Sequence, residues 1–381
     1  MYNIKLLNKI SSSGLSVLPS ASYTCAEDIA DPQGIIVRSA SMHEMEFGGQ
    51  LLAVARAGAG VNNIPIDKCT EQGIAVFNTP GANANAVKEL AVLGLLMSSR
   101  KVFASMQWAQ GLIGEGDKVP ALVEKGKSNF AGPELSGKKI GIIGLGKIGV
   151  MLANIAVALE MEVYGFDPFL TPSGAIKINS AVNLVDSVRE IYSQCDYISL
   201  HLPSTKETKG MVNSQSIATM KPGMRILNFA RGDLVNSADV IAALDAGNLA
   251  CYLTDFPDET LLGHEGVLAI PHLGASTPES EENCAVMASN QIREYLEHGN
   301  VQNAINLPGL VVAPSGKPRV AVFFKGGADT AEQITKLVSG SVSKAEKGDV
   351  GYIIAELDTA PPGDLADKIK SVPGVLRVRV I

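Results

Sequence analysis

Short apolar runs in the N-terminal part of the chain predict β-strands. Each run is bounded by Gly, Pro or Asn, and the runs lie at 34–39, 51–57 and 74–78. From 82 to 107 the apolar residues instead recur at helical spacing, which predicts a helix. Together these elements indicate a small α/β unit. A polar stretch containing Gly and Pro follows at 111–137, and we expect it to connect two domains.

The pattern changes at residue 138. Apolar, β-branched runs now alternate with helical segments, and the runs are KIGIIG, EVYGFD, YISLHLP, RILNFA, CYLTDF and VLAIPH. This alternation predicts βαβ units and a parallel sheet with helices on both faces. We expect a further helix over 277–298, because Thr277 can cap it, Pro278 can open it and Gly299 can end it.

The C-terminal part predicts a small separate domain. After the Pro- and Gly-containing segment 307–318, the pattern is strand, helix, strand, helix and strand. We expect these elements at 319–324, 329–339, 351–357, 363–371 and 375–381. The chain length of 381 residues agrees with two or three domains.

Composition argues against several classes of protein. The net charge of −7 offers no basic surface for nucleic acid, so we expect no nucleic-acid partner. The five cysteines are odd in number and never in CxxC spacing, which argues against a disulfide framework and against a zinc site, so we expect no metal. No apolar run approaches the ~20 residues that span a membrane, and the N-terminus does not resemble a signal peptide. We therefore expect a cytoplasmic protein without a membrane partner.

The segment GIIGLGKIG predicts a dinucleotide site. It places Gly144, Gly146 and Gly149 in G-x-G-x-x-G spacing, after a predicted strand and at the start of a predicted helix. The first glycine permits a tight turn, the second lets the backbone approach a pyrophosphate, and the third lets helix and strand pack closely. The next predicted strand ends at Asp167, whose carboxylate suits the ribose diol of NAD and repels the 2′-phosphate of NADP. The alternative is that the glycines only permit turns and that Asp167 is a surface residue.

Four motifs in this order, GIIGLGKIG, NFARGDLV, TDFPDE and PHLGAST, resemble those of the D-isomer-specific 2-hydroxyacid dehydrogenases. The segments VRS, ARAGAGVNNI and FNTPGANANAVKELAV are similar to the members that oxidise 3-phosphoglycerate, and the tail resembles an ACT regulatory domain. The resemblance implies an α/β fold in which a Rossmann-type NAD-binding domain, 99–275, is inserted in a discontinuous, flavodoxin-like substrate-binding domain, 1–98 and 276–306. A small α+β ACT-like domain, 317–381, would follow.

The implied function is NAD-dependent oxidation of 3-phospho-D-glycerate to 3-phosphohydroxypyruvate, the first step of L-serine biosynthesis. Two alternatives remain, a reductase of glyoxylate or hydroxypyruvate and an NADH-sensing binding protein of the same fold. The family also implies a homodimer or homotetramer, with serine as an effector of the ACT-like domain. The turn FFKGGADTAEQI lacks the Asn-x-Pro-Gly-like sequence associated with serine binding, although Gly326, Gly327 and the helix start near Asp329 could still hold a carboxylate.

Two residues at predicted strand ends match the chemistry of such a reaction. His272, in PHLGAST, belongs to the residue type that exchanges protons near neutral pH, and we expect it to be the general acid–base group. A structural histidine at a strand end is the alternative. Arg231 follows the strand RILNFA, and its planar guanidinium can bind a substrate carboxylate through two hydrogen bonds. A surface arginine in an ion pair is the alternative there.

The sequence leaves two candidates for the acidic partner of His272. The usual family pattern has Asp-Val-Phe before the acid, whereas this chain has Thr-Asp-Phe at 254–256. Aligning on the phenylalanine assigns Glu259, whose carboxylate would orient the imidazole and favour its protonated form. Asp258 is the competing residue.

The resemblance assigns further residues to cofactor and substrate. The expected cofactor contacts are Gly144, Gly146, Lys147, Ile148, Gly149, Asp167, Ala230, Asp255, Gly274 and Ala275. The expected substrate contacts are Arg38, Ser39, Ala57, Gly58 and Asn83. Arg38 would hold the substrate phosphate, and the glycine-rich segment 56–63 would offer backbone N–H groups to the substrate carboxylate. We expect His201 to be structural or close to the cofactor.

Overall fold

The computed structural model describes all residues from 1 to 381 and divides them into two compact units. Unit 1 consists of Met1–Asn83 and Thr277–Ile381, and unit 2 consists of Ala84–Ser276. The chain therefore passes between the units twice, after Asn83 and after Ser276. The first division comes before the boundary expected at 98/99, because the helix that follows Asn83 packs within unit 2.

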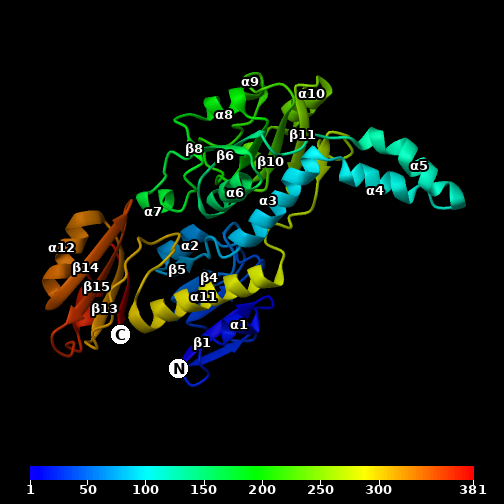
Figure 1. The fold of residues 1–381 in the computed structure, drawn as a ribbon. Helices are drawn as coiled ribbons and strands as arrows, with labels where there is room; N and C mark the ends of the chain where they lie inside the picture. Colours follow the sequence, from blue (N-terminus) through cyan, green and yellow to red (C-terminus); the bar gives the residue numbers. More distant parts are fainter. The chain divides into compact units, whose positions relative to one another are not determined.

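The first part of unit 1 is a five-stranded parallel sheet in the order β2-β1-β3-β4-β5. Its strands are β1 (Tyr2–Leu7), β2 (Tyr23–Ala26), β3 (Gly34–Val37), β4 (Ala53–Arg56) and β5 (Ala75–Phe77). Helices α1 (Ser12–Leu15) and α11 (Pro278–His298) cover one face, and α2 (Ile66–Glu71) lies on the other (Figure 1). In β3, Ile36 joins the core with α11, and Ile35 joins the core with α2. Burial on both faces explains why these strands are continuous apolar runs.

Strands β1 and β2 were not predicted, because neither is a continuous run of buried residues. Helix α11, in contrast, confirms its prediction. Thr277 Oγ1 accepts a hydrogen bond from the N–H of Ser280 at 3.1 Å, and Pro278 is the first helical residue. Gly299 ends the helix with a φ of 72°, a left-handed conformation that glycine adopts without strain.

The last part of unit 1 is a four-stranded antiparallel sheet in the order β14-β15-β13-β16. Its strands are β13 (Arg319–Lys325), β14 (Gly340–Lys347), β15 (Val350–Leu357) and β16 (Val375–Val380). Helices α12 (Gly327–Leu337) and α13 (Leu365–Lys370) cover one face, while Phe323 and Tyr352 join the core with α11 on the other. Strand β14 was not predicted because it is a largely exposed, polar edge strand. The arrangement is compatible with an ACT-like domain.

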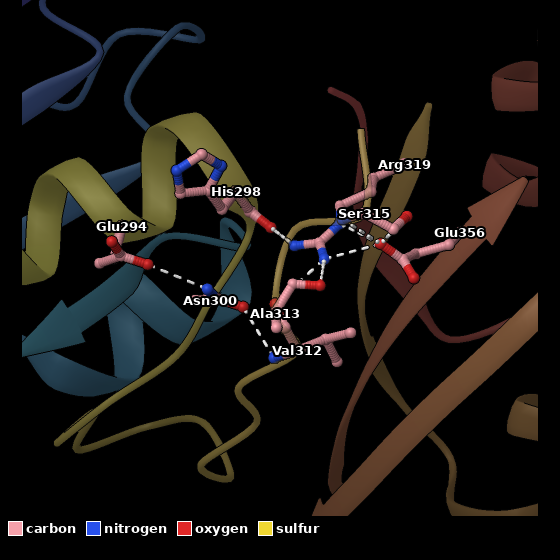
Figure 2. A network of polar contacts seen from close by, with 8 residues as sticks. All are labelled: Glu294, His298, Asn300, Val312, Ala313, Ser315, Arg319 and Glu356. Carbon is pink, nitrogen blue, oxygen red and sulfur yellow. Dashed lines mark hydrogen bonds and ion pairs between the residues drawn. The ribbon is translucent and has the colours of Figure 1, made fainter. Parts of the chain in front are cut away.

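A buried arginine joins this sheet to the end of α11 (Figure 2). Arg319 is 4% exposed, and its guanidinium contacts Glu356 of β15 at 2.8 Å. It also donates to the backbone carbonyls of His298, Val312 and Ala313, at 3.0, 3.0 and 2.7 Å. Because a buried charge is tolerated only when it is paired and hydrogen-bonded, this network fixes the sheet to the chain segment that leads from α11 to β13.

Unit 2 contains a seven-stranded parallel sheet in the order β12-β11-β10-β9-β6-β7-β8. Its strands are β6 (Lys139–Ile143), β7 (Glu162–Phe166), β8 (Asn183–Leu184), β9 (Tyr197–Leu200), β10 (Met224–Asn228), β11 (Leu249–Thr254) and β12 (Val267–Ala269). Helices α3 (Ala84–Ser99) and α6 (Lys147–Ala158) cover one face. Helices α8 (Val188–Gln194), α9 (Ser214–Ile217) and α10 (Ser237–Asp245) cover the other (Figure 1). This doubly covered parallel sheet confirms the predicted Rossmann-type fold.

The segment expected as a connector at 111–137 is instead largely helical, so that prediction was wrong. Helices α4 (Val102–Gln110) and α5 (Val119–Gly126) follow α3 as a pair that extends away from the sheet of unit 2 (Figure 1). The ring of Trp108 on α4 packs against that of Phe130, in the 3-10 turn (Lys127–Phe130) that follows α5, with centroids 5.4 Å apart. The sequence pattern missed α5 because it is short, with Pro near its start and Gly at its end. Nowhere in the chain is a helix both long enough and apolar enough to cross a bilayer.

Candidate dinucleotide and acid–base site

Three glycines after β6 shape a loop with space beside it. Gly144 has a φ of 95°, and a Cβ atom there would lie 2.5 Å from the carbonyl oxygen of His201. A Cβ atom on Gly149 would lie 1.9 Å from the carbonyl oxygen of Gly144. Gly146, at the start of α6, has no atom within 4 Å of its Cβ position. The first and third glycines are therefore required by packing, and the second leaves room for a phosphate at the helix N-terminus.

Asp167 follows β7, and its carboxylate holds the glycine loop through a hydrogen bond. Its Oδ2 accepts from the N–H of Leu145 and its Oδ1 from the N–H of Phe169, both at 2.9 Å. Each carboxylate oxygen has a second lone pair, so the group can still accept a bond from a ribose hydroxyl. Lys147 and Ile148 lie in the first turn of α6, the position at which a helix binds an anion. The loop, the helix start and the acid together fit a dinucleotide.

Arg231, Asp255 and His272 follow three neighbouring strands of the same sheet. Strands β10, β11 and β12 are adjacent and parallel, and each of the three residues comes shortly after one of them. Their carboxyl ends share one edge of the sheet, which is the edge at which α/β proteins bind ligands. The charges of His272 and Arg231 act on the Asp255 carboxylate. The fold thus brings together groups from three separate segments.

Asp255 is buried and has no side-chain partner. The residue is 1% exposed, and no hydrogen bond of good geometry reaches either carboxylate oxygen, although the backbone N–H groups of Asp255 and Gly274 lie near enough to favour its ionised form. Burial raises the pKa of Asp255 above its ordinary value, while the charges of His272 and Arg231 oppose the increase. A Cβ atom on Gly274 would approach Oδ2 to 3.4 Å, so the loop that carries Gly274 and Ala275 passes close to the carboxylate. An acceptor in this state fits a ligand that donates from an amide nitrogen, as the nicotinamide carboxamide does.

His272 is exposed at the carboxyl edge of the sheet. Its imidazole lies against the Phe256 ring, with centroids 4.5 Å apart and planes at 46°. The backbone beneath Phe256 is fixed, because its N–H donates to Thr254 Oγ1 at 3.1 Å. An imidazole supported on one side by an aromatic ring and exposed to solvent can exchange a proton with a bound substrate.

The two candidate acids beside His272 have different surroundings. Asp258 Oδ2 accepts from Ser237 Oγ at 2.6 Å, and its Oδ1 accepts from the N–H of Leu261 at 3.2 Å. Asp258 therefore organises its own loop. Glu259 is exposed and makes no hydrogen bond or ion pair. The structure leaves Glu259 available to a protonated imidazole, and its role stays a prediction.

Asn228 holds the turn that carries Ala230 and Arg231. Its amide nitrogen donates to the carbonyl of Arg231 at 2.9 Å, and its amide oxygen accepts from the N–H of Ala230 at 3.2 Å. The Arg231 side chain is exposed, and one guanidinium nitrogen donates to the carbonyl of Ala230 at 2.6 Å. The remaining N–H groups of the guanidinium keep the capacity to bind a carboxylate.

Arg38 and Ser39 follow β3 in unit 1. Asn8, with a φ of 75°, shapes this loop because its side-chain oxygen accepts from the N–H groups of Ser39 and Ala40, at 3.0 and 2.8 Å. The Arg38 guanidinium forms an ion pair with Glu281 of α11 at 2.6 Å. Sequence reasoning missed both Asn8 and Glu281, because each lies far along the chain from the residues it contacts.

In the glycine-rich segment 56–63, two of the backbone N–H groups expected to bind the substrate carboxylate already have partners. The N–H of Ala57 donates to the carbonyl of Val37 at 2.8 Å, and that of Gly58 donates to the carbonyl of Arg56 at 2.9 Å. These two N–H groups are therefore already used, and a substrate carboxylate would have to be bound by the residues that follow. Asn83 is half-buried and ends unit 1, next to the first passage between units.

His201 behaves as a structural residue. Its Nε2 lies 2.9 Å from Ser199 Oγ, and its carbonyl packs against the close turn at Gly144. Burial lowers the pKa of His201 to about 4, so the ring is neutral at physiological pH. This favours His272 as the histidine that exchanges protons.

The glycine loop, the strand-end acid and the polar groups at the carboxyl edge define a dinucleotide-binding α/β protein. Residues 94–274 match the family model described as D-isomer specific 2-hydroxyacid dehydrogenase, NAD binding domain. The D-3-phosphoglycerate dehydrogenase of Bacillus subtilis (strain 168) is 33% identical over 328 residues, which are 81% of this chain and 60% of that protein. That of Archaeoglobus fulgidus is 35% identical, over 81% of this chain and 56% of that protein.

A solved structure adds a match of similar extent. The cofactor (NAD+)-bound 3-phosphoglycerate dehydrogenase of Entamoeba histolytica is 28% identical, with a TM-score of 0.62, over 81% of this chain and 99% of that chain. Residues 94–274 are an NAD-binding domain of the D-isomer-specific 2-hydroxyacid dehydrogenase family, and the similarity to these relatives extends over about 81% of the chain. The resemblance seen in the sequence is confirmed. The chain spans about 60% of the length of the Bacillus subtilis relative.

Proposed function

We propose that this protein oxidises 3-phospho-D-glycerate to 3-phosphohydroxypyruvate with NAD, the first step of L-serine biosynthesis. The proposal rests on the grouping of Arg231, Asp255 and His272 after three adjacent strands of the sheet that carries the dinucleotide loop. Relatives with 33% and 35% identity bear the name of that enzyme, which supports the choice of substrate.

Each residue of the group has a distinct task in this reaction. When bound, NAD supplies the hydride acceptor. Arg231 would hold the substrate carboxylate through two N–H···O bonds, and His272 would take the proton of the substrate hydroxyl through a ring nitrogen. Asp255 would accept a bond from the nicotinamide amide and so orient that ring. Glu259 would stabilise the imidazole once it is protonated.

Arg38 and Ser39 would bind the substrate phosphate. The ion pair between Arg38 and Glu281 is exposed on both sides, at 41% and 42%, so a phosphate dianion can replace the carboxylate as the partner of the guanidinium. Unphosphorylated acids such as glyoxylate lack this contact. The phosphorylated substrate is therefore the one that uses Arg38 and Ser39.

A substrate panel tests the proposed function. Initial rates are measured with 3-phosphoglycerate and NAD, and with glyoxylate or hydroxypyruvate and NADH. We expect turnover of the phosphorylated acid, and Arg38→Ala should raise its KM far more than the KM for glyoxylate. Equal increases would show that Arg38 does not bind phosphate. No turnover of any substrate would favour an NADH-sensing binding protein.

We further propose a homo-oligomer, a dimer or a tetramer, joined through helices α3 to α5. Large apolar side chains are exposed on these helices and in the turn after α4, namely Leu93, Leu96, Val102, Phe103, Met106, Ile113 and Val123. A second copy of the same surface is a fitting partner, because a two-fold interface uses one patch on both chains. Light scattering should show dissociation for Phe103→Asp and no change for Lys206→Asp, an exposed position of unit 2 outside these helices.

The C-terminal sheet would serve as an ACT-like regulatory domain, and serine is the first effector to test. A serine titration that changes neither the rate nor the melting temperature would remove serine from consideration. We also propose that the enzyme works in the cytoplasm. All five cysteines are free, which agrees with a reducing compartment.

A further inference from the structure

A cavity in unit 1 contains none of the residues assigned above to the cofactor or the substrate. It has a volume of about 470 Å³, and its walls are one side of α11, the turn at Gly81 and Ala82, and the chain just after α11. This volume falls in the range of small-molecule sites, roughly 300–1,000 Å³. Carboxamide side chains dominate the polar wall, and they are Asn283, Asn290, Gln291, Gln302 and Asn303.

Gln291 distinguishes this cavity from a simple surface hollow. The residue lines the cavity and is 5% exposed, yet neither its amide nitrogen nor its amide oxygen has a hydrogen-bond partner. A carboxamide can donate two hydrogen bonds and accept two, and native proteins rarely leave a buried one without any. Asn290 on the same helix donates to the carbonyl of Val286 at 3.0 Å, so the lack of partners is particular to Gln291.

The charges of the wall limit the chemistry of the ligand. No Lys, Arg or His lines the cavity, so a phosphate or a carboxylate would be buried there without a cation. The single acid, Glu294, already accepts from the side chain of Asn300 at 2.9 Å. Val286 and Met287 supply apolar surface between the amides. These walls suit a neutral ligand that combines an apolar face with a hydrogen-bonding edge.

We propose that this cavity binds a neutral, planar ligand whose edge presents a hydrogen-bond donor beside an acceptor, and that the amide of Gln291, which lies buried beneath the cavity wall, turns to pair with that edge. A primary carboxamide has this pattern, and so does the N6/N7 edge of adenine, which glutamine side chains bind through two hydrogen bonds. Val286 and Met287 would contact the face of the ring. The site belongs to unit 1, whereas Arg231, Asp255 and His272 belong to unit 2.

Calorimetric titration of the full-length protein tests the proposal. The protein is kept saturated with NAD, so that the dinucleotide site cannot take up the probes. Adenosine and nicotinamide are titrated, with inosine and nicotinate as matched controls that replace the donor by an acceptor. We expect adenosine or nicotinamide to bind, and the matched control to bind at least about tenfold more weakly, a loss of about 1.4 kcal/mol. Binding of adenosine alone identifies a purine site, and binding of nicotinamide alone identifies a carboxamide site.

Gln291→Leu is the decisive variant, because leucine is apolar and cannot form the paired hydrogen bonds. We expect it to weaken the ligand at least about tenfold and to keep or raise the melting temperature, since an unpartnered buried amide is removed. Gln72→Leu makes the same chemical change at an exposed position outside the cavity and should leave binding unchanged. Met287→Trp narrows the cavity and should also abolish binding. No binding of either probe at millimolar concentration, or binding that both cavity variants leave intact, would overturn the proposal.

Discussion

Asp255→Asn keeps the shape of a buried side chain after β11 and removes its charge. The residue is 1% exposed, has no side-chain partner, and has a pKa that burial raises. A group with a raised pKa in the folded state contributes stability that is fully present below its unfolded pKa and is lost as the pH rises through its folded pKa. We therefore expect the variant to match the wild type at low pH and to melt at a higher temperature at neutral pH.

Although Asp255→Asn should raise the melting temperature at neutral pH, it should weaken the binding of NAD. A hydrogen bond to a charged acceptor contributes about 1.5–3 kcal/mol, which corresponds to roughly a tenfold to 150-fold range in the dissociation constant. The amide introduced by Asp255→Asn is an uncharged acceptor, whose hydrogen bond contributes about 0.5–1.5 kcal/mol. If Asp255 receives the nicotinamide amide, NAD binding should therefore weaken by the difference of about 1–1.5 kcal/mol, which is roughly a fivefold to 13-fold increase in the dissociation constant.

Two measurements check these expectations: calorimetric titration with NAD, and thermal unfolding at low and neutral pH. Asp258→Asn is the control, because Asp258 lies in the same loop but binds Ser237 and the N–H of Leu261. It should change NAD affinity by no more than about twofold, the usual size of a surface effect. Unchanged NAD affinity in Asp255→Asn would refute the role of the buried carboxylate.

The same site and fold support three further predictions. His272→Gln should lower kcat/KM by roughly 10²–10⁴-fold with NAD affinity unchanged, and a smaller loss would argue against its role as general base. Glu281→Gln should release Arg38 and lower the KM for 3-phosphoglycerate by at most about fivefold, because exposed ion pairs contribute about 0.2–1 kcal/mol; the KM for glyoxylate should stay the same. Arg319→Met should lower the free energy of unfolding by about 3–5 kcal/mol in urea titration, since it removes the cation from the Glu356 carboxylate and the donor from three backbone carbonyls. Lys317→Met, in an exposed pair, is the control and should have little effect.

The dinucleotide site could be predicted from the sequence because its requirements are local. Gly144 needs a positive φ, and Gly149 needs the absence of a Cβ atom, within a few residues of each other. The ends of α11 were predictable for the same reason, since Thr277 and Gly299 act on the adjacent backbone. The parallel sheet of unit 2 followed from buried, β-branched strands that alternate with helices.

The features that the sequence did not show depend on distant contacts or lack an apolar run. Strand β14 is a polar edge, so periodicity gave no signal for it. Glu281 meets Arg38 only through the fold, and an acid near a helix start is ordinary by itself. Gln291 is a polar residue at a buried position of α11, and a pattern of apolar residues assigns such a position to the exposed face.

The loop after β11 shows why three nearby acids have different roles. Thr254 Oγ1 already accepts from the N–H of Phe256, so the hydroxyl of Thr254 fixes the turn and the carboxylate of Asp255 is not needed for it. Asp258 is bound to Ser237 and to its own loop, while Glu259 is exposed without a partner. Carboxylates whose surroundings differ in this way are suited to different tasks. The buried carboxylate of Asp255 is therefore suited to accept a hydrogen bond from a cofactor amide. The exposed carboxylate of Glu259 is free to pair with a histidine when that ring becomes protonated.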